Sequence, residues 1–292
     1  MYKNKRVKVG FVGIGLMGRP MVLRLLMANY DVNVWNRTQS KLAEVLSAGA
    51  IECSSVADVA AQSDVILFCL ANANAVEGVA TDVDFLEALS PEKLIVDLSS
   101  ISPGVTAKLA DLVHSQSGAT WVDAPVSGGV PGAEQGTLVI MAGGDQAAID
   151  TVRPLLAAIS NRVTRMGPVG AGQTTKLCNQ IIVGCNIAAI AEAIRLAEHT
   201  GVDAALLPEA LAGGFADSLP FQIFGKRMAA HQESPVSIKI ATMLKDLAGA
   251  IEASENQGID VTLTITAADI LQSRCDAGDD ERCITSLVET EN

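Results

Sequence analysis

The sequence predicts an α/β fold in which a doubly wound parallel sheet is followed by an all-helical second half. Short apolar runs alternate with helical patterns in the first half, whereas strand-like runs nearly vanish after residue 172. Apolar residues make up 49% of the 292 residues, and aromatic residues only 3%. This composition, dominated by Ala, Val, Leu and Ile, suits parallel strands covered by closely packed helices.

The alternation in the first half is regular enough to place individual elements. Strands are expected at residues 7–12, 31–35, 65–70, 94–98 and 120–123, and helices at residues 16–28, 40–48 and 102–115. Because helical patterns separate the strands, we expect the strands to run parallel, with helices on both faces of the sheet.

A stretch rich in glycine and proline at residues 167–172 separates the two halves. It predicts one domain at residues 1–168 and an all-helical domain at residues 169–292. The most apolar segment of the second domain, residues 181–197, is interrupted by polar residues and is expected to be a buried helix rather than a membrane span. Helical patterns occur at residues 174–200, 203–212, 222–230, 239–257 and 262–277.

The chain is acidic, with a formal net charge of −12 at pH 7. No basic cluster offsets this charge, which argues against nucleic acid and against an anionic membrane surface as partners. An anionic ligand must therefore be held by a few local cations and backbone N–H groups.

The cysteines and the N-terminus indicate a reduced, cytoplasmic protein. The six cysteines include no C-x-x-C pair and no zinc-ligand spacing, and only Cys275 and Cys283 leave a disulfide to consider. The N-terminus shows no long apolar segment with a cleavage site, so no signal peptide is expected. No cluster of His, Cys and carboxylate residues predicts a metal site.

A G-x-G-x-x-G motif follows the first expected strand and opens the first expected helix, which is the context of a dinucleotide-binding loop. Its first glycine permits a tight turn, its second lets the backbone approach a pyrophosphate, and its third lets the helix pack close to the strand. The helix N-terminus then offers N–H groups to the phosphates, as in a Rossmann-type domain. The motif consists of Gly13, Ile14, Gly15, Leu16, Met17 and Gly18.

The end of the second expected strand indicates which dinucleotide binds. NAD-binding domains usually carry Asp or Glu there, but this chain has Asn36 followed by Arg37 and Thr38. A guanidinium binds a ribose 2′-phosphate through two hydrogen bonds, whereas a carboxylate repels it. With Thr38 as a further donor and Lys41 nearby, the segment predicts NADP(H), with NAD(H) as the alternative cofactor. An ordinary surface arginine at position 37 is the competing interpretation.

A second glycine-rich segment follows the strand expected at residues 120–123. Ser127, Gly128 and Gly129 would expose a hydroxyl and two successive N–H groups, which suit a small carboxylate. A purely structural turn fits the same spacing equally well.

One lysine near the start of the expected long helix is a candidate for proton exchange. Lys176 lies about one turn into that helix, and Asn179 and Gln180 share its face at helical spacing. The helix dipole disfavours an ammonium group near the N-terminus, a placement that suits general acid–base work. The local pattern is equally compatible with a solvated surface lysine.

Four motifs occur in an order that resembles the β-hydroxyacid dehydrogenase family: residues 13–21, 123–144, 170–180 and 245–247. The family includes 3-hydroxyisobutyrate dehydrogenases, tartronate semialdehyde (2-hydroxy-3-oxopropionate) reductases and glyoxylate/succinic semialdehyde reductases. The resemblance covers nearly the whole chain. It implies a 6-phosphogluconate dehydrogenase-like fold, with an NADP-binding first domain and a helical domain for substrate binding and assembly into homodimers or homotetramers.

The resemblance also implies roles in substrate binding and catalysis. Ser127, Gly128 and Gly129 match the loop that holds the substrate carboxylate. Lys176 matches the lysine that gives a proton to the carbonyl oxygen during reduction and removes it during oxidation. Lys245 matches a lysine close to both cofactor and substrate.

The resemblance also implies roles for other positions, where the residue type varies among members of the family. Ser100 matches a small hydroxyl residue near the nicotinamide ribose, and Leu70 is expected at the cofactor. Many relatives carry Asn four residues after the lysine, where this chain has Gln180 preceded by Asn179. This order is similar to that of tartronate semialdehyde reductases, and either amide is a candidate to bond the substrate hydroxyl.

The resemblance therefore implies an NADP-dependent oxidoreductase that acts on a CH–OH group and interconverts a small β-hydroxy acid and its semialdehyde. A 2-hydroxy-3-oxopropionate reductase or a 3-hydroxyisobutyrate dehydrogenase-like enzyme is favoured, and a glyoxylate/succinic semialdehyde reductase is the alternative. The segment at residues 213–218, where substrate contacts are expected, leaves the substrate open. An NADP-binding module without redox activity is the rival from another class, and Lys176 with Ser127 disfavours it.

Overall fold

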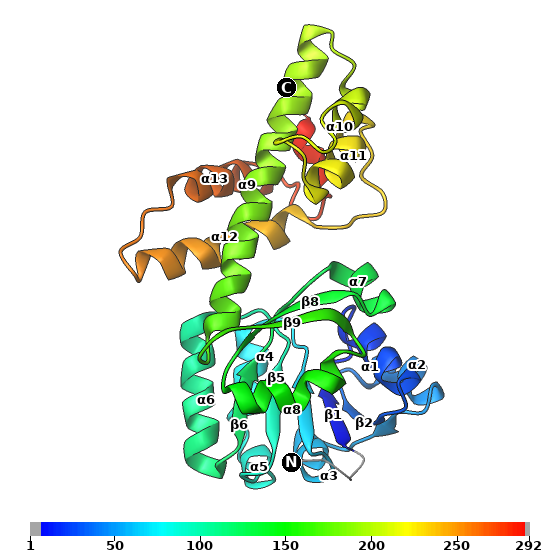
Figure 1. The fold of residues 1–292 in the computed structure, drawn as a ribbon, viewed down its shortest axis with the longest axis vertical. Helices are drawn as coiled ribbons and strands as arrows, with labels where there is room; N and C mark the ends of the chain where they lie inside the picture. The colour runs from blue at the N-terminus through cyan, green and yellow to red at the C-terminus, as the bar shows by residue number, and fades with distance from the viewer. Residues whose placement is uncertain (1–6, 290–292) are drawn as a thin grey trace. The chain divides into compact units, whose positions relative to one another are not determined.

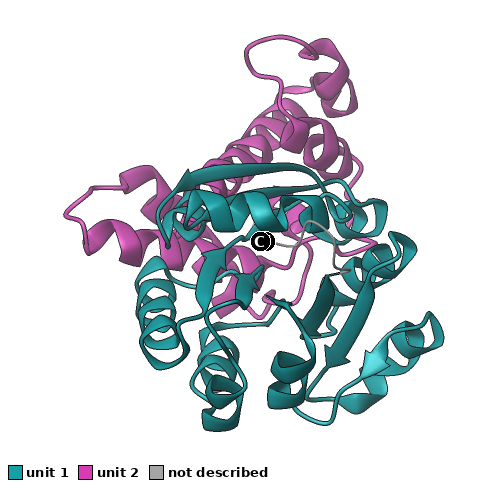
Figure 2. Cartoon of the chain, turned by 60° about the horizontal axis from the view of Figure 1, so that its bottom comes forward, with its two compact units in different colours: residues 1–176 teal, residues 177–292 magenta. Residues whose placement is uncertain are grey.

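The structure is a computed structural model that describes residues 7–289. Within them the chain forms two compact units, one that ends at Lys176 and one that begins at Leu177 (Figure 2). The first unit alternates strands and helices and the second consists of helices, which confirms the predicted fold class. The domain boundary expected after residue 168 falls just before helix α9 (Ala171–Thr200), and that assignment stays a prediction.

The described residues of the first unit form a nine-stranded sheet (Figure 1). Its strands are β1 (Lys8–Val12), β2 (Asp31–Trp35), β3 (Ile51–Glu52), β4 (Val65–Phe68), β5 (Leu94–Asp97), β6 (Thr120–Asp123), β7 (Val126–Ser127), β8 (Leu138–Gly143) and β9 (Ser160–Gly167). The order is β3-β2-β1-β4-β5-β6-β8-β7, with β9 also paired to β8. Strands β1 to β6 pair in parallel, at the places where the sequence predicts strands except for the two-residue β3.

The far edge of the sheet departs from the wholly parallel arrangement that the sequence predicts. Strand β8 pairs antiparallel with β6 and β7. The chain passes from β7 to β8 through the short helix α7 (Gly129–Gln135) and Gly136, whose φ of 70° reverses its direction. This connection is too short for the crossover that parallel strands need, so β8 returns antiparallel.

Helices cover both faces of the sheet, each over its own apolar core. Along β4, Val65 and Leu67 enter one core while Ile66 and Phe68 enter the other, because successive strand residues point to opposite faces. This explains why the strand is one continuous apolar run. The first core includes α1 (Gly18–Met27), α2 (Ala43–Ser47) and α8 (Gln146–Leu156), and the second includes α3 (Val56–Gln62), α4 (Ala73–Ala80), α5 (Val83–Glu87) and α6 (Pro103–Ser117).

The sequence predicts that helix α9 is buried. In the structure, the helix is buried along one face only. Ile187 and Ile194 are fully buried, whereas Ile182 and Leu196 are 67% and 66% exposed. Among the described residues, α9 is the one helix long and apolar enough to span a bilayer, a test that core helices of water-soluble proteins also pass. The second unit also contains η2 (Ala204–Leu206), α10 (Leu207–Ala210), η3 (Phe221–Gly225), α11 (Lys226–Ala229), α12 (Ile240–Glu255), α13 (Thr262–Asp276) and η4 (Ile284–Val288).

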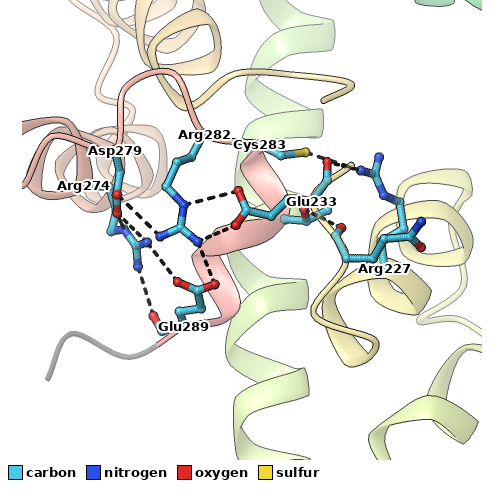
Figure 3. Close-up of polar contacts among 9 residues, drawn as sticks. Arg227, Glu233, Arg274, Asp279, Arg282, Cys283 and Glu289 are labelled. Atoms are coloured by element: carbon cyan, nitrogen blue, oxygen red, sulfur yellow. Dashed lines mark hydrogen bonds and ion pairs between the residues drawn. The ribbon is translucent and has the colours of Figure 1, made fainter. Parts of the chain in front are cut away.

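A network of arginines and carboxylates joins the C-terminal segment of the second unit to α13 and to the loop before α12 (Figure 3). Arg274 is buried, and its Nε donates to Asp279 Oδ2 at 2.8 Å while its Nη1 donates to the carbonyl oxygen of Glu289 at 3.1 Å. Arg282 binds Glu233 Oε1 at 2.5 Å and Glu289 Oε1 at 2.7 Å. The hydrogen bond with Arg282 lowers the pKa of Glu233. The six cysteines, including those at positions 275 and 283, are free thiols.

Replacing Arg274 by Met should lower the free energy of unfolding by about 3 kcal/mol, because the change removes a buried guanidinium that donates to Asp279 Oδ2 and to the carbonyl oxygen of Glu289, and leaves Arg282 as the remaining cation beside Asp279. Urea unfolding of the purified protein measures this change. Lys239→Met is the matched control, since its ion pair with Glu281 is exposed and should contribute less than about 1 kcal/mol. Equal effects of the two substitutions would contradict the importance of the buried network.

Two buried carboxylates lie side by side at the carboxyl ends of β5 and β6, where Asp97 is in register with Asp123. Asp123 accepts hydrogen bonds from the backbone N–H groups of Gly170 at 2.8 Å and Gln173 at 2.9 Å. Asp97 Oδ1 accepts from the N–H of Ser99 at 2.9 Å, and its Oδ2 has no partner among the described residues. Burial raises the pKa of Asp97 to about 7.

The raised pKa of Asp97 predicts a pH dependence of stability. Between about pH 4 and 7 the folded protein keeps a proton on Asp97 that the unfolded chain has lost, so stability should fall as the pH rises through this window. A shift of about three pKa units corresponds to at most about 4 kcal/mol. In urea unfolding from pH 4 to 8, Asp97→Asn should remove this part of the decline, and parallel curves for the two proteins would refute it.

Candidate functional site

A cavity of about 590 Å³ opens at the carboxyl ends of β1, β2 and β4. The strand order reverses between β1 and β4, and ligands of doubly wound sheets bind at such a reversal. Of the residues predicted to bind the cofactor, the cavity brings together Gly13, Gly15, Asn36, Arg37, Thr38 and Leu70. The other lining residues are Trp35, Lys41, Cys69, Ala71, Asn72, Asn74, Ala75, Gly78 and Val79.

The three glycines of the motif at residues 13–18 have the surroundings that a dinucleotide loop requires. Gly13 has a φ of 105°, and a Cβ atom there would collide with the carbonyl group of Cys69. A Cβ atom on Gly18 would collide with the carbonyl oxygen of Gly13, so helix α1 can start this close to β1 only with glycine. A Cβ atom on Gly15 would meet nothing within 4 Å and would occupy the cavity itself. The loop therefore leaves room for a ligand to approach its backbone.

The segment after β2 presents positive charge to this cavity. Arg37 and Lys41 are the charged side chains among the described residues that line it. Asn36 serves the loop itself, because its Oδ1 accepts from the N–H of Ile14 at 2.9 Å and its Nδ2 donates to the carbonyl oxygen of Thr38 at 2.7 Å. These residues fit the phosphate groups of a dinucleotide.

The loops that follow β4 and β5 are joined through Ser99. Its hydroxyl accepts a hydrogen bond from the N–H of Leu70 at 2.9 Å, which fixes one lining residue of the cavity. Ser99 is buried, whereas the adjacent Ser100 is exposed. Ser99 is thus structural, and Ser100, the serine that the resemblance implies near the nicotinamide ribose, has an accessible side chain.

The predicted carboxylate-binding loop lies in the first unit, between β6 and β8. Ser127 ends β7 and is half-buried, and both glycines that follow have positive φ angles, 129° at Gly128 and 61° at Gly129. Glycine adopts such angles without steric cost, which explains why two glycines follow Ser127 at this turn.

Lys176 belongs to the first turns of α9, as the sequence predicts, and is half-buried. The start of this helix is held by Asp123, which binds the N–H groups of Gly170 and Gln173. A Cβ atom on Gly172 would collide with the carbonyl oxygen of Met141, so the helix can begin at this place only with glycine. The position of the lysine is therefore tied to the carboxyl edge of the sheet.

The two candidate amides belong to the second unit and form one hydrogen-bonded chain. Asn179 Nδ2 donates to Gln180 Oε1 at 2.8 Å, and Gln180 Nε2 donates to Asp246 Oδ2. Gln180 is buried and Asn179 only partly so. Lys245 is 60% exposed, with its Nζ 3.8 Å from Asp246 Oδ1. Asp246 is thus the anchor of both amides.

The remaining predicted residues do not line the cavity. Ile14 is buried, Leu16 is exposed, and Met17 packs against the first apolar core of the sheet. The segment at residues 213–218 forms an exposed loop closed by a hydrogen bond of 2.7 Å from the N–H of Gly213 to Asp217 Oδ2. The described residues contain no group of three His, Cys, Asp or Glu side chains that could hold a metal ion.

Sequence reasoning missed three residues on which the site geometry depends. The sequence places Asp123 at the end of an expected strand and at the start of a motif, places Gln173 within the motif at residues 170–180, and assigns no role to Ser99. Two of them carried a weak signal, because a buried acid at the end of a strand and a polar residue in the first turn of an apolar helix both need partners. Their partners are distant in sequence and become visible only in the fold.

Comparison with known proteins agrees with this architecture. Residues 8–167 match the family model described as the NAD-binding domain of 6-phosphogluconate dehydrogenase. Residues 170–290 match the model described as NAD-binding of NADP-dependent 3-hydroxyisobutyrate dehydrogenase. The chain is also 36% identical to the 2-hydroxy-3-oxopropionate reductase of Escherichia coli (strain K12) over 285 residues, 97% of this chain and 96% of the relative.

Two solved structures extend the comparison. The 3-hydroxyisobutyrate dehydrogenase of Mycobacterium tuberculosis with L-serine has a TM-score of 0.89 at 29% identity and covers 97% of this chain and 98% of its own. Psf3 in complex with NADP+ and 2-OPP has a TM-score of 0.85 at 26% identity and covers 96% and 98%. The chain therefore belongs to the β-hydroxyacid dehydrogenase family, whose enzymes use a nicotinamide cofactor to act on a CH–OH group.

Proposed function

We propose that this dehydrogenase uses NADP(H) in preference to NAD(H). The observation that carries the proposal is the charge of the cavity after β2, which Arg37 and Lys41 line and to which no described carboxylate contributes. A ribose 2′-phosphate gains from both cations, while a ribose hydroxyl lacks the acceptor that Asp or Glu would provide in place of Asn36. The related Psf3 structure contains NADP+, which is compatible with the proposal.

We further propose that the substrate is a small carboxylic acid with an aldehyde group, and that 2-hydroxy-3-oxopropionate is the best candidate. The similarity to a 2-hydroxy-3-oxopropionate reductase extends over 97% of this chain, and the Asn179–Gln180 order is the one expected for such reductases. The carboxylate would be bound by Ser127 with the N–H groups of Gly128 and Gly129.

The proposed roles of these residues give a source for both the hydride and the proton of the reaction. When bound, a reduced nicotinamide would supply the hydride that the carbonyl carbon receives. Lys176, as an ammonium group, gives its proton to the carbonyl oxygen as negative charge develops there, and in the oxidative direction it takes the proton back. In this proposal Asn179 or Gln180 would bond the same oxygen, Ser100 and Leu70 would hold the cofactor, and Lys245 would bind cofactor or substrate.

We also propose that the protein assembles into homodimers or homotetramers. The exposed apolar face of α9, with Ile182 and Leu196, is of the kind that homodimer or homotetramer interfaces cover. We also propose a cytoplasmic location, which the free cysteines favour.

A substrate panel tests the reaction directly. Consumption of NADPH and NADH should be measured with 2-hydroxy-3-oxopropionate, glyoxylate and succinic semialdehyde, and the reverse reaction with 3-hydroxyisobutyrate and L-serine. The proposal expects the highest kcat/KM for 2-hydroxy-3-oxopropionate with NADPH. Tight NADPH binding without turnover of any compound would favour a binding module without redox activity.

Lys176→Ala should lower kcat by about 100-fold or more while NADPH still binds, because the variant lacks the group that exchanges the proton. Steady-state kinetics and fluorescence titration of NADPH measure the two quantities. Lys108→Ala, which removes an exposed lysine of α6, is the control and should leave both unchanged. A near-normal kcat in the Lys176 variant would show that the proton comes from elsewhere.

Arg37→Asp should shift the ratio of kcat/KM for NADPH over NADH toward NADH by about 10-fold or more, since it replaces a partner of the phosphate by a repelling charge. Arg162→Asp introduces the same change of charge at an exposed position of β9, away from the cavity, and should leave the ratio unaltered. The cofactor proposal fails if both variants keep the wild-type ratio.

A further inference from the structure

We propose that Gln173 is a positioning residue that holds the cofactor-side loop at residues 99–101 against the helix turn that carries Lys176. This inference rests on the proposed function, since it concerns the same reaction. Gln173 does not touch the reacting atoms in the proposal. It acts through Ser100, the exposed serine expected near the nicotinamide ribose.

The side chain of Gln173 binds the backbone on both sides of Ser100. Its Nε2 donates to the carbonyl oxygen of Ser99 at 2.8 Å, and its Oε1 accepts from the N–H of Ile101 at 3.3 Å. Ser99 and Ile101 are buried whereas Ser100 is exposed. The amide therefore fixes the two peptide groups that determine where the serine hydroxyl points.

The backbone of the same residue is fixed from the opposite side. The N–H of Gln173 donates to Asp123 Oδ2 at 2.9 Å, at the end of β6. Gln173 is only 1% exposed, so solvent does not replace these bonds if they are lost. Lys176 lies three residues further along α9. Gln173 therefore links the end of β6, the loop after β5 and the helical turn that carries the proposed proton donor.

An amide can make both side-chain bonds without depending on pH. It supplies one donor and one acceptor at fixed geometry, whereas an ionised carboxylate only accepts and an aliphatic chain does neither. A displacement of about 1 Å between cofactor and proton donor can lower the rate by about 100-fold, so a clamp at this place bears on kcat more than on binding.

The test compares Gln173→Met, which keeps the length of the side chain and removes both bonds, with the wild-type protein. We expect kcat to fall about 10-fold or more and the Kd for NADPH to change less than about 3-fold. The deuterium isotope effect on kcat with NADPH labelled at the transferred position should rise, because hydride transfer then limits the rate. Thr175→Val is the control, since it removes a hydrogen bond of 2.7 Å within the same turn and spares the clamp.

A second variant covers the case in which Gln173→Met does not fold. Gln173→Glu keeps the acceptor for Ile101 and regains the donor for Ser99 when its carboxyl group carries a proton. Burial of this position and the neighbouring carboxylate of Asp123 favour that protonated form. Its kcat, relative to the wild-type value at each pH, should therefore rise as the pH falls.

The outcomes separate this inference from the proposed function. Absence of wild-type turnover with every compound of the panel contradicts the proposed function. Wild-type turnover together with unchanged kcat and isotope effect in Gln173→Met contradicts the positioning role alone. A proportional loss of NADPH binding and kcat would mean that Gln173 only stabilises the fold, as would a Gln173→Glu variant whose relative activity does not depend on pH.

Discussion

The carboxylate of Asp123 is the contact on which the geometry of the first unit depends. The first N–H groups of a helix have no partner within the helix, and a buried helix start must find them elsewhere. Asp123 binds two of them, those of Gly170 and Gln173, and its negative charge complements the positive end of the helix dipole. The cost of burying the carboxylate is offset in the same way, because both oxygens receive hydrogen bonds. The start of α9 is thus fixed to the end of β6 before any contact with a ligand is made.

From this anchor a path of hydrogen bonds leads to the cofactor cavity. Gln173 joins the helix start to the backbone of Ser99, and the hydroxyl of Ser99 joins that loop to Leu70 in the cavity wall. Each step is buried or partly buried, where a lost hydrogen bond is not replaced by water. The loops after β4 and β5 and the helix that carries Lys176 are therefore parts of one polar network. This places the proposed proton donor on a rigid element, which suits a reaction that depends on orientation.

The sequence predicts those parts of the site that depend on local geometry. Gly13, Gly15 and Gly18 can be assigned because a tight turn, a close approach and a packed helix start each require glycine in a fixed spacing, and Arg37 because it follows the strand directly. The sequence could not assign a role to Gln173. The groups that its side chain binds, the carbonyl oxygen of Ser99 and the N–H of Ile101, lie more than 70 residues away in the chain. The antiparallel return through β8 was missed for a related reason: a short helix after Gly128 resembles the start of a crossover until the pairing of the strands is known.

Two carboxylates at the edge of the sheet, Asp97 and Asp123, are buried, which bears on how a protein with a net charge of −12 can bind an anionic cofactor. The carboxylates nearest to the sheet edge are either bonded by N–H groups, as in Asp123, or have a pKa raised by burial, as in Asp97. Both arrangements reduce the negative potential that these residues exert on the carboxyl ends of the strands. Charges on the distant surface are screened over about 10 Å at moderate ionic strength. Arg37 and Lys41 are the charged side chains of the described residues that line the cavity, so an acidic protein can present positive charge to a dinucleotide there without an extended basic surface.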